Sequence, residues 1–204
     1  MKAKVKISLA IPVYNGGSNL EKNLKFFYQS CDKKKFKNFI ELIISDNGST
    51  DNTQKIIKKY KKKFAKKNNI RIIYFRREKN VGYYYNFLKL IKLITGEYTL
   101  FLCDDDFPQK KFYDEIFNLF KNNNYDELCF LPVASIKEFK SKIFGLNKFG
   151  HVLTRGSSLS GVILKTKKIN TKYLEKTLYP HNTVFLNYYL NNGMRNLDLK
   201  SKII

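Results

Sequence analysis

The sequence predicts an α/β fold: a mostly parallel sheet with helices on both faces. Short apolar runs alternate with stretches of helical periodicity from the first residues onward. Each crossover helix returns the chain to the end of the sheet at which the previous strand began. Repeated strand–helix units therefore give parallel strands that are covered by helices on both sides. At 204 residues the chain fits one domain with a sizeable core.

Four strands are expected in the first half of the chain. They are residues 7–11, 42–44, 70–75 and 98–103. Each is a short apolar run bounded by polar residues or by residues that break regular structure. Pro12 is expected to end the first strand, because proline has no N–H to give to the ladder.

Three helices are expected between these strands. Ser18 and Glu21 have the spacing of a capping box, which predicts the start of the first helix. Asp51 is expected to cap the second helix, whose lysines would face water. The third helix follows Gly82, and Gly96 is expected to end it as a C-terminal glycine.

The pattern is weaker after Phe107. We expect a helix over residues 112–120, strands over 128–133 and 161–165, and a last helix from about Asn182 to Leu190. Residues 137–158 are rich in Gly, Ser and Lys, which predicts a mobile loop.

The chain is strongly basic, with 39 Lys and Arg against 17 Asp and Glu and a formal net charge of +22. A field of this sign attracts phosphates, nucleic acid or an anionic membrane face. The densest lysine run, residues 55–67, lies on the second expected helix. It is either a solvated helix face or a contact for a membrane or another polyanion.

Cys31, Cys103 and Cys129 are odd in number and widely spaced, which favours neither a disulfide framework nor a zinc site and suits a reducing cytoplasm. No apolar run approaches the roughly 18 residues that span a bilayer. Pro12 interrupts the first apolar stretch, so no signal peptide is expected. We therefore expect a cytoplasmic protein that is soluble or peripheral on the inner face of the membrane.

Three adjacent carboxylates, Asp104, Asp105 and Asp106, directly follow the fourth expected strand. Adjacent carboxylates repel one another, which raises at least one pKa unless a cation neutralises them. Hard cations such as Mg²⁺ or Mn²⁺ take carboxylate oxygens and keep positions open for substrate phosphates. By itself, however, the triplet is as consistent with an acidic surface loop.

Other polar segments also follow expected strands: residues 13–19, 45–51 and 76–83. In parallel α/β sheets, ligands bind beyond the carboxyl ends of the strands. These segments and the acidic triplet should therefore converge on one rim and form one site.

Four motifs occur in order along the first half of the chain. They are Pro12-Val-Tyr-Asn-Gly16, Ser45-Asp-Asn-Gly-Ser-Thr-Asp51, Asn80-Val-Gly82 and Gly96-Glu-Tyr98, the last leading into the aspartates. Together they resemble family 2 glycosyltransferases, which have the GT-A fold, a Rossmann-like nucleotide-binding α/β domain. The match covers roughly residues 5–110, about half the chain. The acidic triplet and Asn86-Phe resemble most the branch that builds bacterial surface polysaccharides.

The resemblance implies a metal-dependent, inverting transfer of a sugar from a nucleotide-sugar donor to a glycan or lipid-linked acceptor. Residues 1–110 would form the nucleotide-sugar-binding half, and residues 111–204 the acceptor-side half of the same domain. UDP is the default nucleotide. Family members usually run longer, so the alternative within the family is an incomplete or inactive transferase: a truncated chain, one that needs a partner, or one that has lost activity.

The resemblance also assigns the donor side of the site. The segment that would line the base and ribose consists of Pro12, Val13, Tyr14 and Asn15. Asp46 would accept a hydrogen bond from a pyrimidine N–H, whereas Asp51 is expected to cap its helix. Arg76 or Arg77 would face the base or phosphates, with a surface role as the alternative for either.

The aspartates would hold Mn²⁺ or Mg²⁺ against the diphosphate of the donor. Aligned with the usual Asp-x-Asp-Asp of the family, Asp105 falls at the metal-ligand position and Asp104 near the ribose, with Asp104 a second metal ligand. Cys103 stands where the first Asp would be, which is a departure from the family pattern.

Inverting transfer needs a general base that deprotonates the acceptor hydroxyl. The candidates are Glu175 and His181, with Asp106 and Asp198 less favoured. For His181 the alternative is a structural role. Residues 156–161 resemble the acceptor-side segment that precedes the base in relatives; the alternative is a turn before a strand.

Two other functions are consistent with parts of the sequence. A nucleotidyltransferase would have a Gly-rich, Arg-containing loop after the first strand, where this chain has Pro12-Val-Tyr-Asn-Gly16. A nucleic-acid-binding protein would explain the basic charge and the run Tyr83-Tyr84-Tyr85. It leaves the aspartates unexplained, since carboxylates repel phosphate, so nucleic acid is not the expected partner.

Overall fold

The computed structural model describes residues 5–31, 34–67, 70–131, 159–172, 174, 176, 178–197 and 199–204. The expected mobile loop at 137–158 lies outside the described residues. Among the described residues, no helix is long and apolar enough to span a bilayer.

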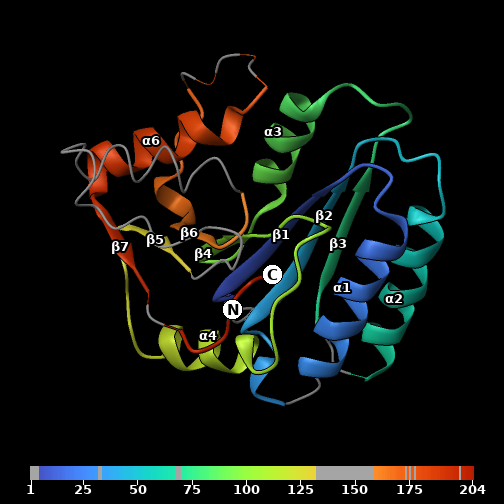
Figure 1. The fold of residues 1–204 in the computed structure, drawn as a ribbon, viewed down its shortest axis with the longest axis horizontal. Helices are drawn as coiled ribbons and strands as arrows, with labels where there is room; N and C mark the ends of the chain where they lie inside the picture. The colour runs from blue at the N-terminus through green and yellow to red at the C-terminus, as the bar shows by residue number, and fades with distance from the viewer. Residues whose placement is uncertain are drawn as a thin grey trace.

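The described strands form one seven-stranded sheet in the order β3-β2-β1-β4-β6-β5-β7 (Figure 1). Their bounds are Ile7–Val13 for β1, Ile40–Asp46 for β2, Ile72–Arg76 for β3, Tyr98–Phe101 for β4, Leu128–Phe130 for β5, Val162–Lys165 for β6 and Met194–Asn196 for β7. Strand β6 runs antiparallel to both of its neighbours, β4 and β5, whereas all other pairs are parallel. The expected mostly parallel sheet is confirmed.

Helices cover both faces of the sheet. On one face the core contains side chains of α1 (Gly17–Ser30), α2 (Thr53–Lys67) and α4 (Phe112–Phe120). On the other it contains side chains of α3 (Tyr83–Leu93) and α6 (Pro180–Asn192). Short 3₁₀ turns occur at Lys34–Phe36 and Thr166–Lys168.

Strands β1, β2 and β4 bury both faces, as expected for central parallel strands, whereas the edge strands β3 and β7 are partly exposed. In β2, Leu42 and Ile44 join the core under α1 and α2, whereas Ile43 joins the core under α3. Alternate side chains of a strand point to opposite faces, so every apolar residue of this run is buried in one of the two cores.

Aromatic rings fix the helices against the sheet. On the α1 side, the ring of Phe27 lies edge-on to Tyr113, with centroids 5.0 Å apart. On the other side, Phe101 of β4 contacts Phe87 of α3 and Phe185 of α6, at 5.6 and 5.7 Å. Such pairs stabilise a core by more than the burial of their apolar area alone. Here they hold α3 and α6 against Phe101, the last residue of β4.

The expectation that Pro12 ends the first strand is wrong. Strand β1 continues through Pro12 to Val13, in register with Ser45 and Asp46 of β2. Its pairing with β4 stops at Ala10. Beyond that point β1 has a ladder partner on one side only, where a residue without an N–H is tolerated.

The expected capping box at the start of α1 is also wrong. Helix α1 begins at Gly17 without a side-chain cap. The N–H of Gly17 donates instead to Oγ1 of Thr53, at 3.0 Å, and Glu21 pairs with Lys59 of α2 at 2.7 Å. A tertiary contact with the neighbouring helix has replaced the local cap of Ser18.

Gly96 does not end α3, whose last residue is Leu93. A Cβ atom at position 96 would lie 2.7 Å from the backbone nitrogen of Ser8. The glycine is needed for the close approach of two backbones and not for a helix end. The other expected elements are confirmed with shifts of a few residues, and the helix over 112–120 has the expected bounds.

The C-terminal segment, residues 199–204, lies beside the segment that follows the acidic triplet. Phe107 N–H donates to the carbonyl of Ile204 at 2.7 Å, and Ile204 N–H donates back to Phe107 at 2.9 Å. Gln109 N–H donates to the carbonyl of Lys202 at 2.8 Å. The segment therefore pairs with Phe107–Gln109 in an antiparallel manner.

Candidate functional site

The polar segments that follow β1, β2, β3 and β4 converge on one pocket of about 540 Å³. This confirms that the segments share one rim. They line the pocket with Pro12, Val13, Tyr14, Asn47, Asn80, Gly82, Tyr83, Asn86, Cys103, Asp104 and Asp105. The second half of the chain closes it with Leu159, Leu178, Tyr179 and His181.

The segment after β1 is bound to the segment after β2. Asn15, with φ of 54°, accepts the N–H of Thr50 on its side-chain oxygen at 2.9 Å. Its own N–H donates to Oγ of Ser49 at 2.9 Å. Asn is one of the residues that tolerate this left-handed conformation. Asn15 therefore fixes the two loops together and leaves Tyr14 with 46% of its surface exposed beside the pocket.

Asp46 lies beneath these loops and is completely buried. One carboxylate oxygen accepts the N–H and the hydroxyl of Ser49, at 2.8 and 2.6 Å. The other accepts the hydroxyl of Tyr74 at 2.8 Å, and Arg76 Nε lies 3.6 Å from it. Burial, followed by this contact with Asp46, raises the pKa of Tyr74. Asp46 thus organises the loop, and its role toward a base stays a prediction.

The expected arginines do not line the pocket. Arg76 donates from Nη2 to the carbonyl of Ser49 at 2.9 Å, and Arg77 donates from Nη2 to the carbonyl of Tyr85 at 3.0 Å. Arg76, the last residue of β3, thus binds the loop after β2, and Arg77 binds the first turn of α3.

Asn47 and Asn80 join the segments after β2 and β3, and the sequence alone did not single them out as site residues. Nδ2 of Asn47 donates to Oδ1 of Asn80 at 2.8 Å, and Val81 N–H donates to Asn47 at 3.2 Å. Gly48, with φ of 78°, allows this contact, because a Cβ atom there would lie 2.4 Å from the carbonyl carbon of Lys79. Their place inside two of the recognised motifs was the available signal.

Asp104 is packed against the loop after β1. A Cβ atom at Gly16 would lie 2.5 Å from a carboxylate oxygen of Asp104. The side-chain amide of Asn23 donates to the backbone carbonyl of Asp104 at 2.8 Å. Burial, and then the charges of Asp105 and Asp106, raise the pKa of Asp104 to about 6. The expected repulsion within the triplet is present, but burial contributes more.

Among the described residues, ligand atoms of Cys103, Asp105 and Asp106 form one group that could hold a metal ion, all within 4.8 Å of one another. The expected pair was Asp105 with Asp104, so the geometry adds Asp106 to Asp105, and Asp104 as a ligand stays a prediction. Burial raises the pKa of the Cys103 thiol to about 12, so it stays protonated near neutral pH. The two carboxylates fit a hard cation better than this thiol does.

Ser160 holds this group in place and was missed at the level of sequence. Its hydroxyl accepts the N–H of Cys103 at 2.7 Å and hydrogen-bonds to the carboxylate of Asp106. Ser160 is buried and directly precedes β6. The only signal was the segment 156–161, of which the last three residues are described.

His181 reaches the pocket at the start of α6 but has only 4% of its surface exposed. Its Nδ1 lies 3.2 Å from the hydroxyl of Tyr83, and its ring is surrounded by those of Tyr83, Phe87, Tyr179 and Phe185. Beside it, Leu178 and Tyr179 are 82% and 59% exposed. Glu175 and Asp198, the other candidate bases, lie outside the described residues.

Comparison with known proteins gives a consistent result. The family described as Glycosyl transferase family 2 matches residues 8–192. A glycosyltransferase of Mycoplasma genitalium is 33% identical over 141 residues, which are 68% of this chain and 45% of that protein. Abequosyltransferase RfbV of Salmonella typhimurium is 37% identical over 100 residues, 49% of this chain and 28% of that protein. The chain thus spans less than half the length of these relatives.

Solved structures show the same fold. TarS residues 1–349 of S. aureus in complex with UDP-GlcNAc superimposes with a TM-score of 0.70 at 20% identity, over 98% of this chain and 58% of that one. The mannosyltransferase PcManGT of Pyrobaculum calidifontis, in complex with GDP-Man and Mn²⁺, gives 0.63 at 11% identity, over 97% and 55%. With three of the four motifs and the acidic triplet gathered at one pocket, and with the family match extending over residues 8–192, the chain belongs to glycosyltransferase family 2 and has the GT-A fold.

Proposed function

We propose that this glycosyltransferase moves a sugar from a nucleotide-sugar donor to a glycan or lipid-linked acceptor, with a bound Mn²⁺ or Mg²⁺ ion and with inversion at the anomeric carbon. The observation that carries the proposal is the single pocket into which all four strand-end segments open, with Asp104 and Asp105 on its wall. Inversion is taken from the family resemblance.

The donor nucleotide would bind between the segments after β1 and β2. Val13 and the half-exposed ring of Tyr14 offer an apolar wall for a base, and the amide of Asn47 offers polar contacts in the same pocket. Asp46 supports this wall from below through Ser49. We keep UDP as the default nucleotide, since UDP, UDP-GlcNAc or GDP-Man is bound in solved structures of the same fold.

The cation would be held by Asp105 and Asp106, with Asp104 beside them. When bound, it would neutralise the negative charge that develops on the diphosphate as the glycosidic bond breaks. Ser160 keeps Asp106 in place, and Gly16 leaves the space that the Asp104 carboxylate fills. Two solved neighbours were crystallised with Mn²⁺, which supports a divalent ion here.

The acceptor would enter on the side of the exposed Leu178 and Tyr179. Because Asp106 belongs to the metal group, the general base would be His181 or Glu175. For His181, the contact of Nδ1 with the Tyr83 hydroxyl would fix the orientation of the ring, with Nε2 on the side away from that hydroxyl.

The acceptor class is supported by what relatives act on. A Staphylococcus aureus relative, 32% identical over 127 residues, is a poly(ribitol-phosphate) β-N-acetylglucosaminyltransferase. A Borreliella burgdorferi relative, 27% identical over 126 residues, is a cholesterol galactosyltransferase. These two relatives act on a polymer and on a lipid. Both kinds of acceptor are consistent with a peripheral enzyme that builds a bacterial surface polysaccharide at the inner face of the cell membrane.

The first experiment is a thermal shift of the purified protein against UDP, GDP, CDP and dTDP, each with and without Mn²⁺. A nucleotide at about 100 times its dissociation constant adds roughly 2.7 kcal/mol, which is roughly 5–11 °C at this size. The shift should need Mn²⁺ with one nucleotide and should be lost in Asp105→Asn. Asp126→Asn, the same change at an exposed carboxylate paired with Lys165, should keep it.

The alternatives predict other results. A folded protein that shifts with no nucleotide would be an incomplete or inactive transferase that needs a partner. Binding of duplex DNA with a steep dependence on salt, without nucleotide affinity, would instead identify a nucleic-acid-binding protein.

A further inference from the structure

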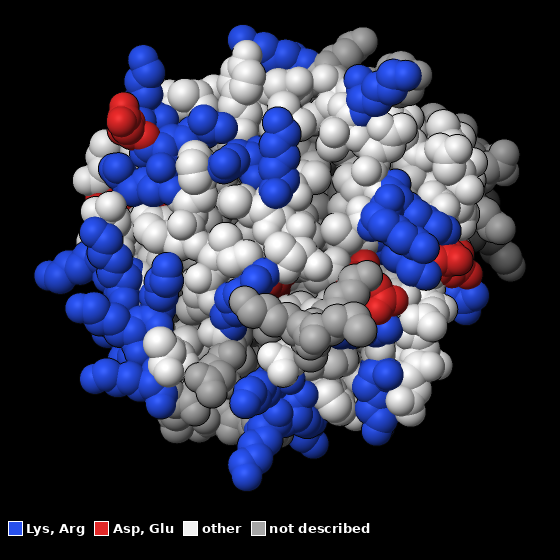
Figure 2. Space-filling model, turned by 180° about the vertical axis from the view of Figure 1, so that it is seen from behind, with Lys and Arg blue, Asp and Glu red and all other residues white. Residues whose placement is uncertain are grey.

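A lysine-rich surface lies on α1 and α2, outside the pocket. We call it the lysine face, and it consists of the exposed residues Lys22, Lys25, Lys55, Lys58, Lys59, Lys62 and Lys63. Seen from behind, blue side chains gather along the left edge of the molecule, which is the α2 side of Figure 1 (Figure 2). Helix α2 contains no acidic residue, and Glu21 of α1 is already paired with Lys59 at 2.7 Å.

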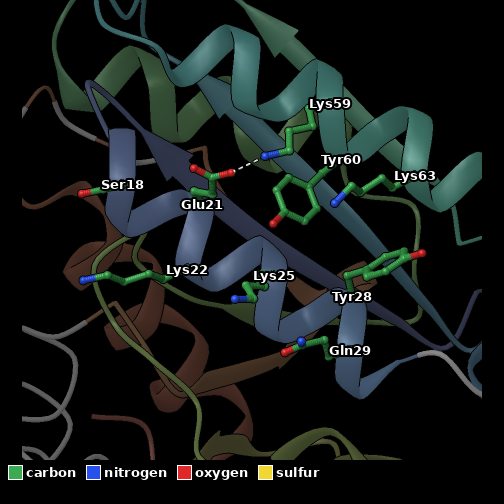
Figure 3. A pocket seen from close by; sticks show the side chains of 9 residues that line it. All are labelled: Ser18, Glu21, Lys22, Lys25, Tyr28, Gln29, Lys59, Tyr60 and Lys63. Atoms are coloured by element: carbon green, nitrogen blue, oxygen red, sulfur yellow. Dashed lines mark hydrogen bonds and ion pairs between the residues drawn. The ribbon is translucent and has the colours of Figure 1, made fainter.

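The lysine face is hollowed. A groove of about 550 Å³ runs between α1 and α2, with Lys22 and Lys25 on one bank and Lys59 and Lys63 on the other (Figure 3). A second hollow of about 380 Å³ adjoins it along α2 and shares Lys59. The positive charge therefore covers a surface that is wider than the groove between α1 and α2 alone.

Tyrosine rings form the floor of the groove. Lys63 Nζ lies 5.1 Å from the ring centroid of Tyr60 and 5.9 Å from that of Tyr28, and Lys59 Nζ lies 5.7 Å from Tyr60. The rings hold the ammonium groups at the surface while the apolar stems cover Tyr60, which is 3% exposed. Lysines gathered this closely repel one another, and an anionic partner relieves that repulsion.

The chemistry of the face favours a fluid array of phosphates over a nucleic acid. Arginine, which binds phosphate in a fixed two-pronged geometry, is absent from α1 and α2. No large hydrophobic side chain of these described helices is exposed, and the two rings of the groove floor are already in contact with Lys59 and Lys63, which leaves them poorly placed to stack on a base. Lysines act as mobile point charges, which suits lipid headgroups.

The lysine face adjoins the metal-site loop. Lys22 Nζ lies 5.8 Å from the ring centroid of Phe107, the residue that directly follows Asp106. Helix α1 begins at Gly17, whose neighbour Gly16 touches Asp104. A surface bound to the lysine face would thus lie next to the entrance of the pocket.

We propose that the lysine face docks the enzyme on a bilayer that contains anionic phospholipids. The inference rests on the proposed function in one respect, namely that the acceptor is held at a membrane. Docking through α1 and α2 would place the acidic triplet beside the headgroup layer, within reach of a lipid-anchored acceptor.

Flotation with vesicles tests the proposal on the whole chain. We expect binding to vesicles of phosphatidylcholine with about 30% phosphatidylglycerol, none to phosphatidylcholine alone, and release as salt rises from about 0.15 to about 0.5 M. Lys25→Glu with Lys63→Glu should weaken binding by about 30-fold or more, since each lysine near such a surface contributes about 1 kcal/mol.

The matched control is Lys121→Glu with Lys167→Glu, an equal charge change at exposed lysines outside α1 and α2. It should keep most of the binding. An equal loss in the control would mean that net charge alone drives binding, and would overturn the proposal. So would groove-dependent binding of duplex DNA in place of vesicles, or equal binding to phosphatidylcholine.

The nucleotide-dependent thermal shift separates this result from the donor-site proposal. Both double variants should keep that shift, which also shows that they fold. Loss of vesicle binding with the shift retained would support the lysine face, and a wild-type protein that binds nucleotide but no vesicle would refute docking and leave the transferase proposal intact.

Discussion

At the scale of single residues, the site depends on contacts between loops that are distant in the sequence. Asp46 is recognisable from its motif, but its burial under Ser49 and Tyr74 is a property of three chain segments together. Ser160, about 55 residues beyond the triplet, is needed to fix Asp106. The sequence could name the residue types of the site but not these supports, because a hydroxyl in a loop has no periodic signal.

Gly16 gives a residue-scale prediction. Its backbone has φ of −70°, which any residue adopts, so a change to alanine tests packing alone. In Gly16→Ala the new Cβ would overlap Asp104 and Val13, each closer than 2.7 Å. We expect a loss of about 1–3 kcal/mol in the free energy of unfolding and weaker Mn²⁺ binding, because Asp104 must move.

Calorimetric titration with Mn²⁺ and urea unfolding measure the two effects. The control is Gly193→Ala at the end of α6, where φ is 74° and the nearest atom to a new Cβ lies 4.0 Å away. This variant should lose stability through backbone strain but bind Mn²⁺ as the wild type does. A Gly16→Ala protein with unchanged metal affinity would contradict the placement of Asp104.

At the scale of elements, order and type could be read from the sequence, but helix starts could not. The apolar periods of α1, α2, α3 and α4 are long and regular, so these helices were expected. Ser18 and Glu21 fit a capping box, yet Thr53 of the next helix contacts the first N–H of α1. A tertiary partner competes with the local cap, and no single-sequence rule reports it.

Substitutions at Thr53 and Ser18 test this exchange of caps. Thr53→Val keeps the shape of a completely buried side chain but removes the acceptor for Gly17 N–H, and should cost about 1–3 kcal/mol of stability. Ser18→Ala, at an exposed position without a capping bond, should stay within about 0.5 kcal/mol of wild type. Urea unfolding of both variants measures these losses of stability. A larger loss for Ser18→Ala than for Thr53→Val would mean that Ser18 caps the helix after all.

At the scale of the whole molecule, the mostly parallel sheet followed from repeated strand–helix units and the GT-A fold from the family resemblance, whereas the place of β6 between β4 and β5 followed from neither. An antiparallel strand inserted from the second half leaves no mark in local periodicity. It makes both halves part of one sheet, so the division at residue 110 into donor and acceptor halves stays a proposal about function.

The stability of the metal-free protein should depend on pH through the triplet. Burial and the neighbouring charges raise the pKa of Asp104 to about 6 from an ordinary value of 3.8, and that of Asp106 is also raised. The folded state then binds more protons than the unfolded chain in this range. Stability is therefore greatest below about pH 4 for these groups and falls as pH rises toward about 6.

Urea unfolding in a chelating buffer, from about pH 4 to about pH 7, measures this slope. Asp104→Asn should flatten it, leaving the part due to Asp106. Added Mn²⁺ should oppose the decline, because a cation favours the ionised carboxylates. Parallel pH curves for the variant and the wild type would count against a raised pKa.

The pairing of residues 199–204 with Phe107–Gln109 has a consequence for the timing of folding during synthesis. Strands β1 to β4 and the helices between them can form once Phe101 has left the ribosome, because their pairings with one another all lie within the first 101 residues. The segment after the aspartates must wait for a partner translated about 95 residues later. The cation loop is thus completed last, so the nascent chain would hold a formed nucleotide cradle before it can hold its metal.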